Sequence, residues 1–273
     1  MKRVLTAMVA LPILLFAIWS RSPYPFAILA TAAILLALSE FYDLSARLGP
    51  HPSRILGYAA AISMAVCFVT AHSSWIVAIL SLLVFASLAA SLSRTDEMEK
   101  SLAAASATLF GAAYVGMLGS FLIGVRMTPE QPAAPHLGPK LITTFLAIVM
   151  LTDTGAYYIG RAIGRHKLSP KVSPGKTIEG AIGGLIAGTL AGPICSLIFF
   201  RELPLIDAAL LGGVVSVIGQ AGDLAESMLK RGSGVKDSSN LLPGHGGMLD
   251  RLDSILVTAP LIYYYSRHFV SKH

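Results

Sequence analysis

Residues 55–93 read ILGYAAAISMAVCFVTAHSSWIVAILSLLVFASLAASLS, and this stretch contains no Asp, Glu, Lys or Arg. Two further stretches, 101–125 and 180–200, are also free of charged side chains. An uncharged apolar stretch of about 18 residues or more is long enough to cross the hydrocarbon core of a bilayer as a helix. The sequence therefore predicts a helical protein that spans a membrane.

The composition of the whole chain agrees with this prediction. Of its 273 residues, 54% are hydrophobic and 13% are charged, whereas a soluble domain carries about 25% charged residues. This composition excludes a soluble or secreted globular protein and a disordered one. Cys67 and Cys195 both lie inside apolar runs, so we interpret them as small core residues and not as a disulfide or a metal pair.

Hydrophobic runs between charged and turn residues predict an all-α, polytopic integral membrane protein with about nine transmembrane helices. Lys2 and Arg3 precede the first run as in a signal peptide, but no A-x-A-like site follows it, so we expect an uncleaved first helix. The predicted helices lie near 4–20, 24–44, 55–71, 74–92, 102–125, 140–160, 178–200, 206–230 and 250–267.

The basic residues predict how these helices are oriented. With nine spans, the N-terminus shares one side of the membrane with every second loop. That side carries all of the 21 Lys and Arg residues but six, so the positive-inside rule places it in the cytoplasm. We expect a protein of the inner membrane. Its net charge of +6 then reflects cytoplasmic loops beside an anionic lipid bilayer and not binding to nucleic acid. The six exceptions are Arg21, Arg126, Lys140, Arg201, Arg267 and Lys272.

Carboxylates inside membrane helices are costly and mark functional sites. Asp153 lies in the sixth run, Asp223 and Glu226 lie near the end of the eighth, and Asp250 and Asp253 begin the ninth. Opposed acidic faces repel each other unless a cation lies between them, and oxygen ligands without clustered His or Cys favour Mg²⁺, Mn²⁺ or Ca²⁺ over zinc. The alternative is that these acids only pair with neighbouring Lys and Arg. The residues alone leave both interpretations open.

Helical periodicity places the acids on defined faces. Asp250 and Asp253 are three residues apart and share one face. A stripe along the eighth run consists of Gln220, Asp223, Ser227 and Lys230.

Two of the predicted cytoplasmic loops, 161–179 and 228–251, combine basic residues with hydroxyl side chains and glycines. Charged donors, hydroxyls and backbone amides bind polyphosphates, although basic loops beside a membrane also bind lipid headgroups. A metal and a polyphosphate together at a membrane surface indicate phosphoryl or nucleotidyl transfer. We interpret His245, in the glycine-rich segment 243–247, as a substrate contact, with a turn residue as the alternative.

The end of the second loop carries an extended signature. The sequence reads S-M-L-K-R at 227–231, K-D at 236–237 and L-P-G-H-G-G-M-L-D-R-L-D at 242–253, preceded by D-T-G-A-Y at 153–157 and K-L-S-P-K-V-S-P-G-K-T-I-E-G at 167–180. These motifs resemble the phosphatidate cytidylyltransferase family, also called the CDP-diacylglycerol synthases. The resemblance is close over the C-terminal half, whereas the N-terminal residues match only as apolar helices.

The resemblance implies an integral membrane enzyme that joins CTP to phosphatidic acid, giving CDP-diacylglycerol and pyrophosphate, with Mg²⁺ as its cofactor. It implies a scaffold of transmembrane helices in 1–130, with lipid or dimer contacts, and a catalytic region in 131–273 that contains both cytoplasmic loops. Asp223 and Asp250 become the metal ligands and, with Lys230 and Arg251, the catalytic set. The implied substrate-binding residues are Ser173, Lys176, Thr177, Glu179, Ser227, Arg231, Lys236, Asp237, His245 and Asp253.

Two other functions share some of these features. A CTP-dependent polyprenol or phytol kinase would use a similar site, but the full signature from Ser227 to Asp253 argues against it. A cation transporter would also carry carboxylates in its helices, but it would not need two basic, hydroxyl-rich loops. Gly184, Gly188 and Gly192 recur every fourth residue, a spacing that lets helices approach closely and permits a homodimer without requiring one.

Overall fold

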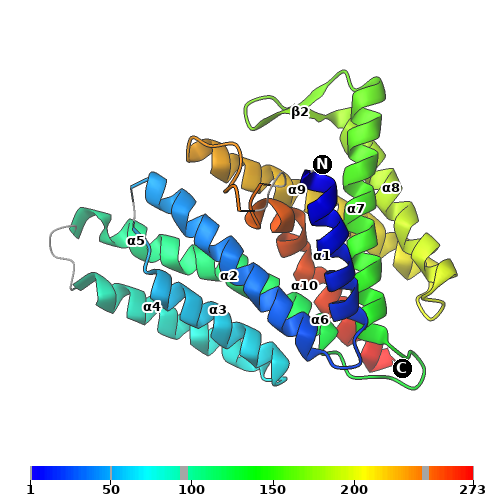
Figure 1. The fold of residues 1–273 in the computed structure, drawn as a ribbon, viewed down its shortest axis with the longest axis horizontal. Coiled ribbons are helices and arrows are strands. Elements are labelled where there is room, and N and C mark those ends of the chain that lie inside the picture. The colour runs from blue at the N-terminus through cyan, green and yellow to red at the C-terminus, as the bar shows by residue number, and fades with distance from the viewer. Residues whose placement is uncertain (1, 50, 93–97, 242–245, 273) are drawn as a thin grey trace. The chain divides into compact units, whose positions relative to one another are not determined.

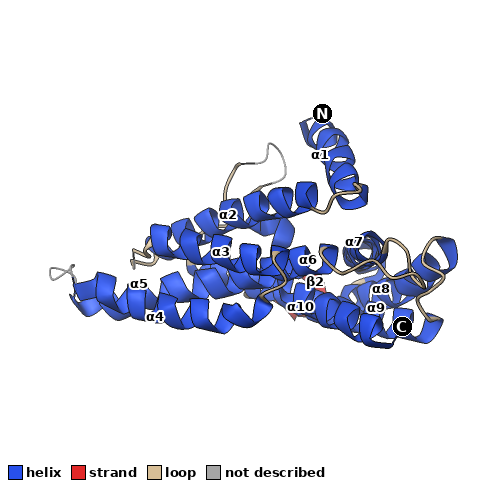
Figure 2. Ribbon diagram, turned by 90° about the horizontal axis from the view of Figure 1, so that it is seen from below, coloured by secondary structure: helices blue, strands red, loops and turns tan. Residues whose placement is uncertain are grey.

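The computed structural model describes residues 2–49, 51–92, 98–241 and 246–272 (Figure 1). Helices make up most of this described chain, and strands occur only in one short hairpin (Figure 2). The prediction of an all-α membrane protein is therefore confirmed. The helices are α1 (Lys2–Trp19), α2 (Tyr24–Arg47), α3 (Arg54–Val69), α4 (Ile76–Leu92), α5 (Met98–Gly111), α6 (Leu118–Arg126), α7 (Leu137–Ile163), α8 (Ile178–Ile198), α9 (Leu205–Gly232) and α10 (Leu249–Lys272).

Most of the predicted transmembrane runs coincide with one of these helices. The fifth run is the exception, because a π-helical segment, Ala112–Met117, joins α5 to α6 within it. In the described part of the chain, six helical segments are long and apolar enough to cross a membrane. The protein is thus a multi-pass membrane protein, and the number of nine spans stays a prediction. The six segments are Tyr24–Arg47, Ser73–Leu92, Met98–Arg126, Leu137–Ile163, Ile178–Ile198 and Leu205–Gly232.

The chain packs as two compact units. The first unit consists of Met1–Met127 and Leu229–Leu252, and the second consists of Thr128–Met228 and Asp253–His273. The segment Leu229–Leu252 therefore packs with the N-terminal helices, and the division predicted near residue 130 stays a prediction. The scaffold and catalytic roles predicted for 1–130 and 131–273 stay predictions.

Tyr42 of α2 is at the centre of the first unit. Its ring is fully buried, and its hydroxyl donates a hydrogen bond to the carbonyl oxygen of Thr108 at 3.0 Å. A Cβ atom at Gly57 of α3 would lie 1.8 Å from the Tyr42 hydroxyl oxygen, and one at Gly111 of α5 would lie 2.5 Å from the ring. Glycine at both positions therefore lets three helices close around one aromatic side chain.

The second unit is organised around the close packing of α7 against α8, which lie side by side in Figure 1. A Cβ atom at Gly188 would lie 2.2 Å from Thr152 Oγ1 of α7 and 1.9 Å from Ser216 Oγ of α9. The two hydroxyls share a buried hydrogen bond of 2.7 Å. The glycine spacing of α8 is therefore used for packing inside one chain, and the predicted homodimer stays untested.

A β-hairpin connects α7 to α8. Its strands, β1 (Lys167–Ser169) and β2 (Ser173–Thr177), pair antiparallel, with Lys167 opposite Thr177 and Ser169 opposite Ser173. Thr177 then serves as the N-cap of α8, because its hydroxyl oxygen accepts a hydrogen bond from the backbone N–H of Gly180 at 3.1 Å. The predicted basic loop 161–179 thus contains a short, anchored hairpin.

Candidate active site

A pocket of about 440 Å³ lies beside the hairpin in the second unit. This volume lies within the usual range for small-molecule sites. Its walls come from α7, both strands of the hairpin, the start of α8 and the middle of α9. The charged and polar residues that line it are Asp153, Tyr157, Arg161, Ser173, Lys176, Thr177, Gln220 and Asp223.

An ion pair between β2 and α9 forms part of the pocket wall. Lys176 Nζ lies 2.5 Å from Asp223 Oδ2, and each side chain is 29% exposed. Because the pair is only partly open to solvent, its attraction is screened less than that of a fully exposed pair. The structure therefore brings together two predicted site residues that are 47 positions apart in the sequence.

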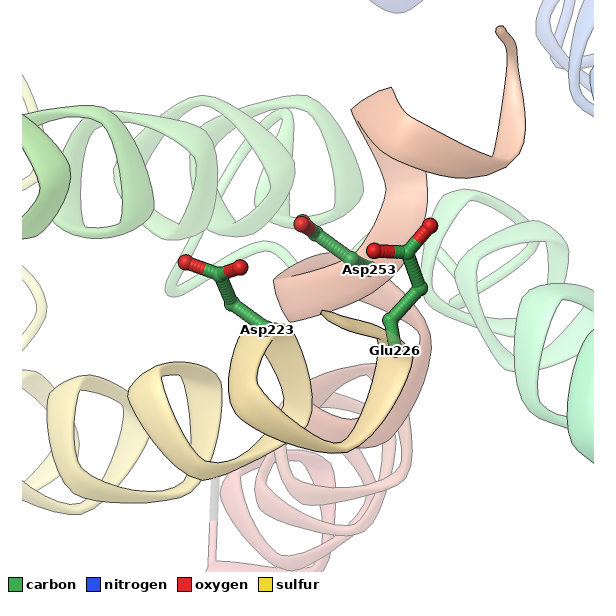
Figure 3. A group of neighbouring side chains, drawn as sticks. All are labelled: Asp223, Glu226 and Asp253. Carbon is green, nitrogen blue, oxygen red and sulfur yellow. The ribbon is translucent and has the colours of Figure 1, made fainter. Parts of the chain in front are cut away.

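Asp223 also belongs to a group of three carboxylates, which we call the acidic cluster: Asp223, Glu226 and Asp253. Each residue contributes one carboxylate oxygen, and these atoms lie within 4.8 Å of one another. In Figure 3 the side chains of Asp223 and Glu226 come from α9 and that of Asp253 comes from α10. Glu226 is fully buried.

The local sequence explains why the acidic cluster forms. The three-residue spacing of Asp223 and Glu226 places both on one side of α9. Gly222 lets α10 approach, because a Cβ atom there would lie 2.2 Å from Val257 Cγ2 and 3.1 Å from the carbonyl oxygen of Asp253. Three carboxylates without His or Cys are the hard donors that suit Mg²⁺ and similar cations. The residues of the acidic cluster therefore fit a divalent metal ion.

Glu179 anchors the base of the hairpin. Its carboxylate accepts hydrogen bonds from the backbone N–H groups of Arg165, at 3.0 Å, and His166, at 3.2 Å. The His166 Nδ1 atom lies 2.6 Å from the same carboxylate. Glu179 does not line the pocket, so it holds the hairpin in place, and its predicted contact with the nucleotide stays a prediction.

Asp250 lies in the first unit and has a dense set of partners. Its carboxylate accepts hydrogen bonds from Lys230 Nζ at 2.6 Å, from Ser238 N and Oγ, both at 3.0 Å, and from Gly247 N at 2.8 Å. The side chains of Lys230 and Asp250 are 11% and 6% exposed. The sequence left open whether these acids pair with neighbouring basic residues, and Asp250 does pair with Lys230. The predicted metal-ligand role of Asp250 stays a prediction.

Known proteins of similar sequence identify the family. The sequence model of the cytidylyltransferase family matches residues 1–269. The chain belongs to this family. A phosphatidate cytidylyltransferase of Staphylococcus aureus (strain COL) is 35% identical over 271 residues, which is 95% of this chain and 96% of that protein.

Other relatives in this family match over shorter stretches. The phosphatidate cytidylyltransferase of Bacillus subtilis (strain 168) is 39% identical over 153 residues, or 56% of this chain and 55% of the relative. That of Synechocystis is 37% identical over 182 residues, or 59% of this chain and 61% of the relative. The chain thus spans little more than half the length of these two proteins.

The other residues predicted for the site differ in their exposure to solvent. Ser227 is half-buried, Arg231, Lys236, Asp237 and Arg251 are exposed, and His245 lies outside the described residues. The Arg231 guanidinium donates a hydrogen bond to the carbonyl oxygen of Val235 at 3.2 Å.

The sequence marked Glu226 as a functional carboxylate but not as a metal ligand, and it gave the pocket residue Arg161 no role. The three-residue spacing from Asp223 is the signal that could have found Glu226. Arg161 is one of several basic residues in its loop, and the sequence contains no signal that distinguishes it from the others.

Proposed function

We propose that the protein transfers the cytidylyl group of CTP to phosphatidate, giving CDP-diacylglycerol and pyrophosphate. The observation that carries this proposal is the ion pair of Lys176 and Asp223 in the pocket wall, with Asp223 shared by the acidic cluster. A cation beside an oxygen-rich metal site is suited to a metal-bound polyphosphate. The name of the Staphylococcus aureus relative, which matches nearly the whole chain, supports the choice of substrates.

We further propose that Asp223, Glu226 and Asp253 hold Mg²⁺. The ion would offset the mutual repulsion of the three carboxylates. When bound, Mg²⁺ supplies charge neutralisation for phosphate oxygens and helps to orient them. Asp250, the second ligand implied by the family signature, lies outside the acidic cluster, and its metal-ligand role stays a prediction.

In this proposal Lys176 has two successive partners. Without nucleotide it neutralises Asp223, and with nucleotide it makes a charge-assisted contact to a phosphate.

A phosphate oxygen of the lipid forms a bond to the α-phosphorus of CTP, and the bond from that phosphorus to the β-phosphate oxygen breaks. No general base is needed, because the lipid phosphate is already ionised at neutral pH. The residues therefore act by positioning and by charge stabilisation.

We propose that this reaction takes place at the cytoplasmic face of the inner membrane. Phosphatidate is a membrane lipid and CTP is a cytosolic nucleotide, so the site must reach both. The hairpin that borders the pocket belongs to the loop 161–179, whose five basic residues the positive-inside rule assigns to the cytoplasm.

The test uses purified protein with CTP labelled at either the α- or the γ-phosphate, offered with phosphatidate or with a polyprenol. We expect the α-label in CDP-diacylglycerol and the γ-label in pyrophosphate. Transfer of the γ-label to the polyprenol would instead establish a kinase, and absence of both transfers would refute both enzymatic functions. Asp223→Asn serves as the inactive variant, and Glu99→Gln, which changes an exposed carboxylate of α5, serves as the matched control.

A further inference from the structure

Glu40 is a buried carboxylate in the part of the chain that the sequence predicts to be a scaffold. It lies on α2 and is 4% exposed. A carboxylate inside a membrane helix is costly unless hydrogen bonds or counter-charges compensate for its desolvation. Among the described residues, this compensation comes from one region, the signature segment Ser227–Asp253.

The Glu40 carboxylate accepts four hydrogen bonds from the described residues. Oε1 accepts from Ser239 Oγ at 2.6 Å and from the backbone N–H of Met248 at 2.9 Å. Oε2 accepts from Ser238 Oγ at 2.9 Å and from the backbone N–H of Leu249 at 2.8 Å. The middle of the signature segment, at Ser238 and Ser239, and its last part, at Met248 and Leu249, are therefore both attached to a single side chain.

Two of these bonds cap α10. Met248 and Leu249 lie at the start of this helix, where backbone N–H groups have no partner within the helix and where a negative charge is favoured. Close packing adds to the constraint, because a Cβ atom at Gly247 would lie 2.4 Å from Glu40 Oε2 and 2.0 Å from Ser238 Oγ. Glycine at position 247 thus lets the backbone reach the carboxylate.

Ser238 connects Glu40 to Asp250. Its hydroxyl oxygen lies 2.9 Å from Glu40 Oε2 and 3.0 Å from Asp250 Oδ2, so its single proton is shared between the two carboxylates, and its backbone N–H also donates to Asp250. Gly247 N donates to the same Asp250 carboxylate, which also binds Lys230. Of the three residues that donate to Asp250, Ser238 is hydrogen-bonded to Glu40 and Gly247 packs against it.

We propose that Glu40 is a positioning residue for the signature segment: from α2 it fixes Ser238 and the start of α10, and thereby the geometry of Asp250 and Lys230. Glu40 acts through these residues and not through contact with a substrate. The kinetic part of this inference rests on the proposed function.

The test compares Glu40→Gln and Glu40→Ala with Tyr42→Phe. Gln keeps one acceptor oxygen and so can keep two of the four bonds, whereas Ala keeps none. Tyr42→Phe removes a buried hydrogen bond two residues away on α2, to Thr108, without touching the signature segment. It therefore controls for a general loss of packing in this unit.

We expect kcat to fall about a hundredfold in Glu40→Ala, as is typical when catalytic groups shift by about 1 Å, and less in Glu40→Gln. The KM values for CTP and phosphatidate should change little. Hydrogen–deuterium exchange of the amides of Met248 and Leu249 should speed up in both variants and stay unchanged in Tyr42→Phe.

Unchanged kcat in Glu40→Ala, or equal losses of kcat in Glu40→Ala and Tyr42→Phe, would overturn the positioning role. Unchanged exchange at Met248 and Leu249 would overturn the attachment itself. If the wild-type protein lacks cytidylyl transfer, the proposed function fails, while the exchange measurement still decides whether Glu40 holds the segment.

Discussion

Replacement of Lys176 by alanine should have opposite effects on metal and nucleotide binding. The side chain neutralises Asp223 at 2.5 Å, and both groups are 29% exposed. The pair is worth about 1–2 kcal/mol, between the values for exposed pairs and for charged hydrogen bonds in the interior. Without nucleotide, a metal ion that binds Asp223 must displace this lysine. Lys176→Ala should therefore tighten Mn²⁺ binding about five- to thirtyfold.

The same variant should bind CTP less well. A single charge-assisted contact to a phosphate contributes about 1.5–3 kcal/mol, so the apparent KM for CTP should rise about tenfold to 150-fold. The KM for phosphatidate should stay nearly constant. Mn²⁺ binding is measured by electron paramagnetic resonance on the nucleotide-free protein, and both KM values are measured at saturating Mg²⁺.

Lys171→Ala is the matched control, because this exposed lysine belongs to the same hairpin but does not line the pocket. An unchanged KM for CTP together with a raised KM for phosphatidate would place Lys176 on the lipid side of the site. If neither metal binding nor any kinetic constant changes, the pair with Asp223 has no part in function.

Three further predictions concern the acidic cluster, the orientation and the pH dependence of stability. Asp223→Asn and Glu226→Gln should each abolish turnover and weaken Mn²⁺ binding while the protein still inserts and purifies normally; near wild-type activity in either variant would remove that residue from the site. A cysteine at Lys171, in a chain without its native cysteines, should react with an impermeant thiol reagent only after the membrane is opened, and labelling of intact cells would refute the cytoplasmic orientation. Burial opposes ionisation of Glu202, but its hydrogen bond and ion pair with Lys140 outweigh burial and hold its pKa below the usual value. A lowered pKa in the folded state stabilises the protein at pH values above the unfolded pKa of about 4.3. The melting temperature should therefore decrease as the pH falls below that value, and it should decrease less in Glu202→Gln. Equal dependence of the melting temperature on pH in the two proteins would contradict this.

Much of the fold could be predicted because its signals are local. A run such as 55–93 predicts membrane-spanning helices whatever surrounds it, since each residue contributes its own transfer free energy. The signature from Ser227 to Asp253 likewise identified the family, which the match to residues 1–269 confirms. Helical spacing also placed Asp223 on a defined face of its helix. The predicted stripe of Gln220, Asp223, Ser227 and Lys230 did not include Glu226.

Tertiary structure alone decided which of these groups meet. The sequence could not show that Lys176, placed by a two-stranded hairpin, would pair with Asp223, because strands of three and five residues carry too little periodicity to be recognised. Glu40 illustrates the same limit over a longer distance: its place in the predicted run 24–44 marks it as a costly carboxylate but does not indicate its partners. Its partners, Ser238 and Leu249, are 198 and 209 residues away. Hydrophobicity determines that the helices enter the membrane, but the packing of their side chains determines which buried charges find partners.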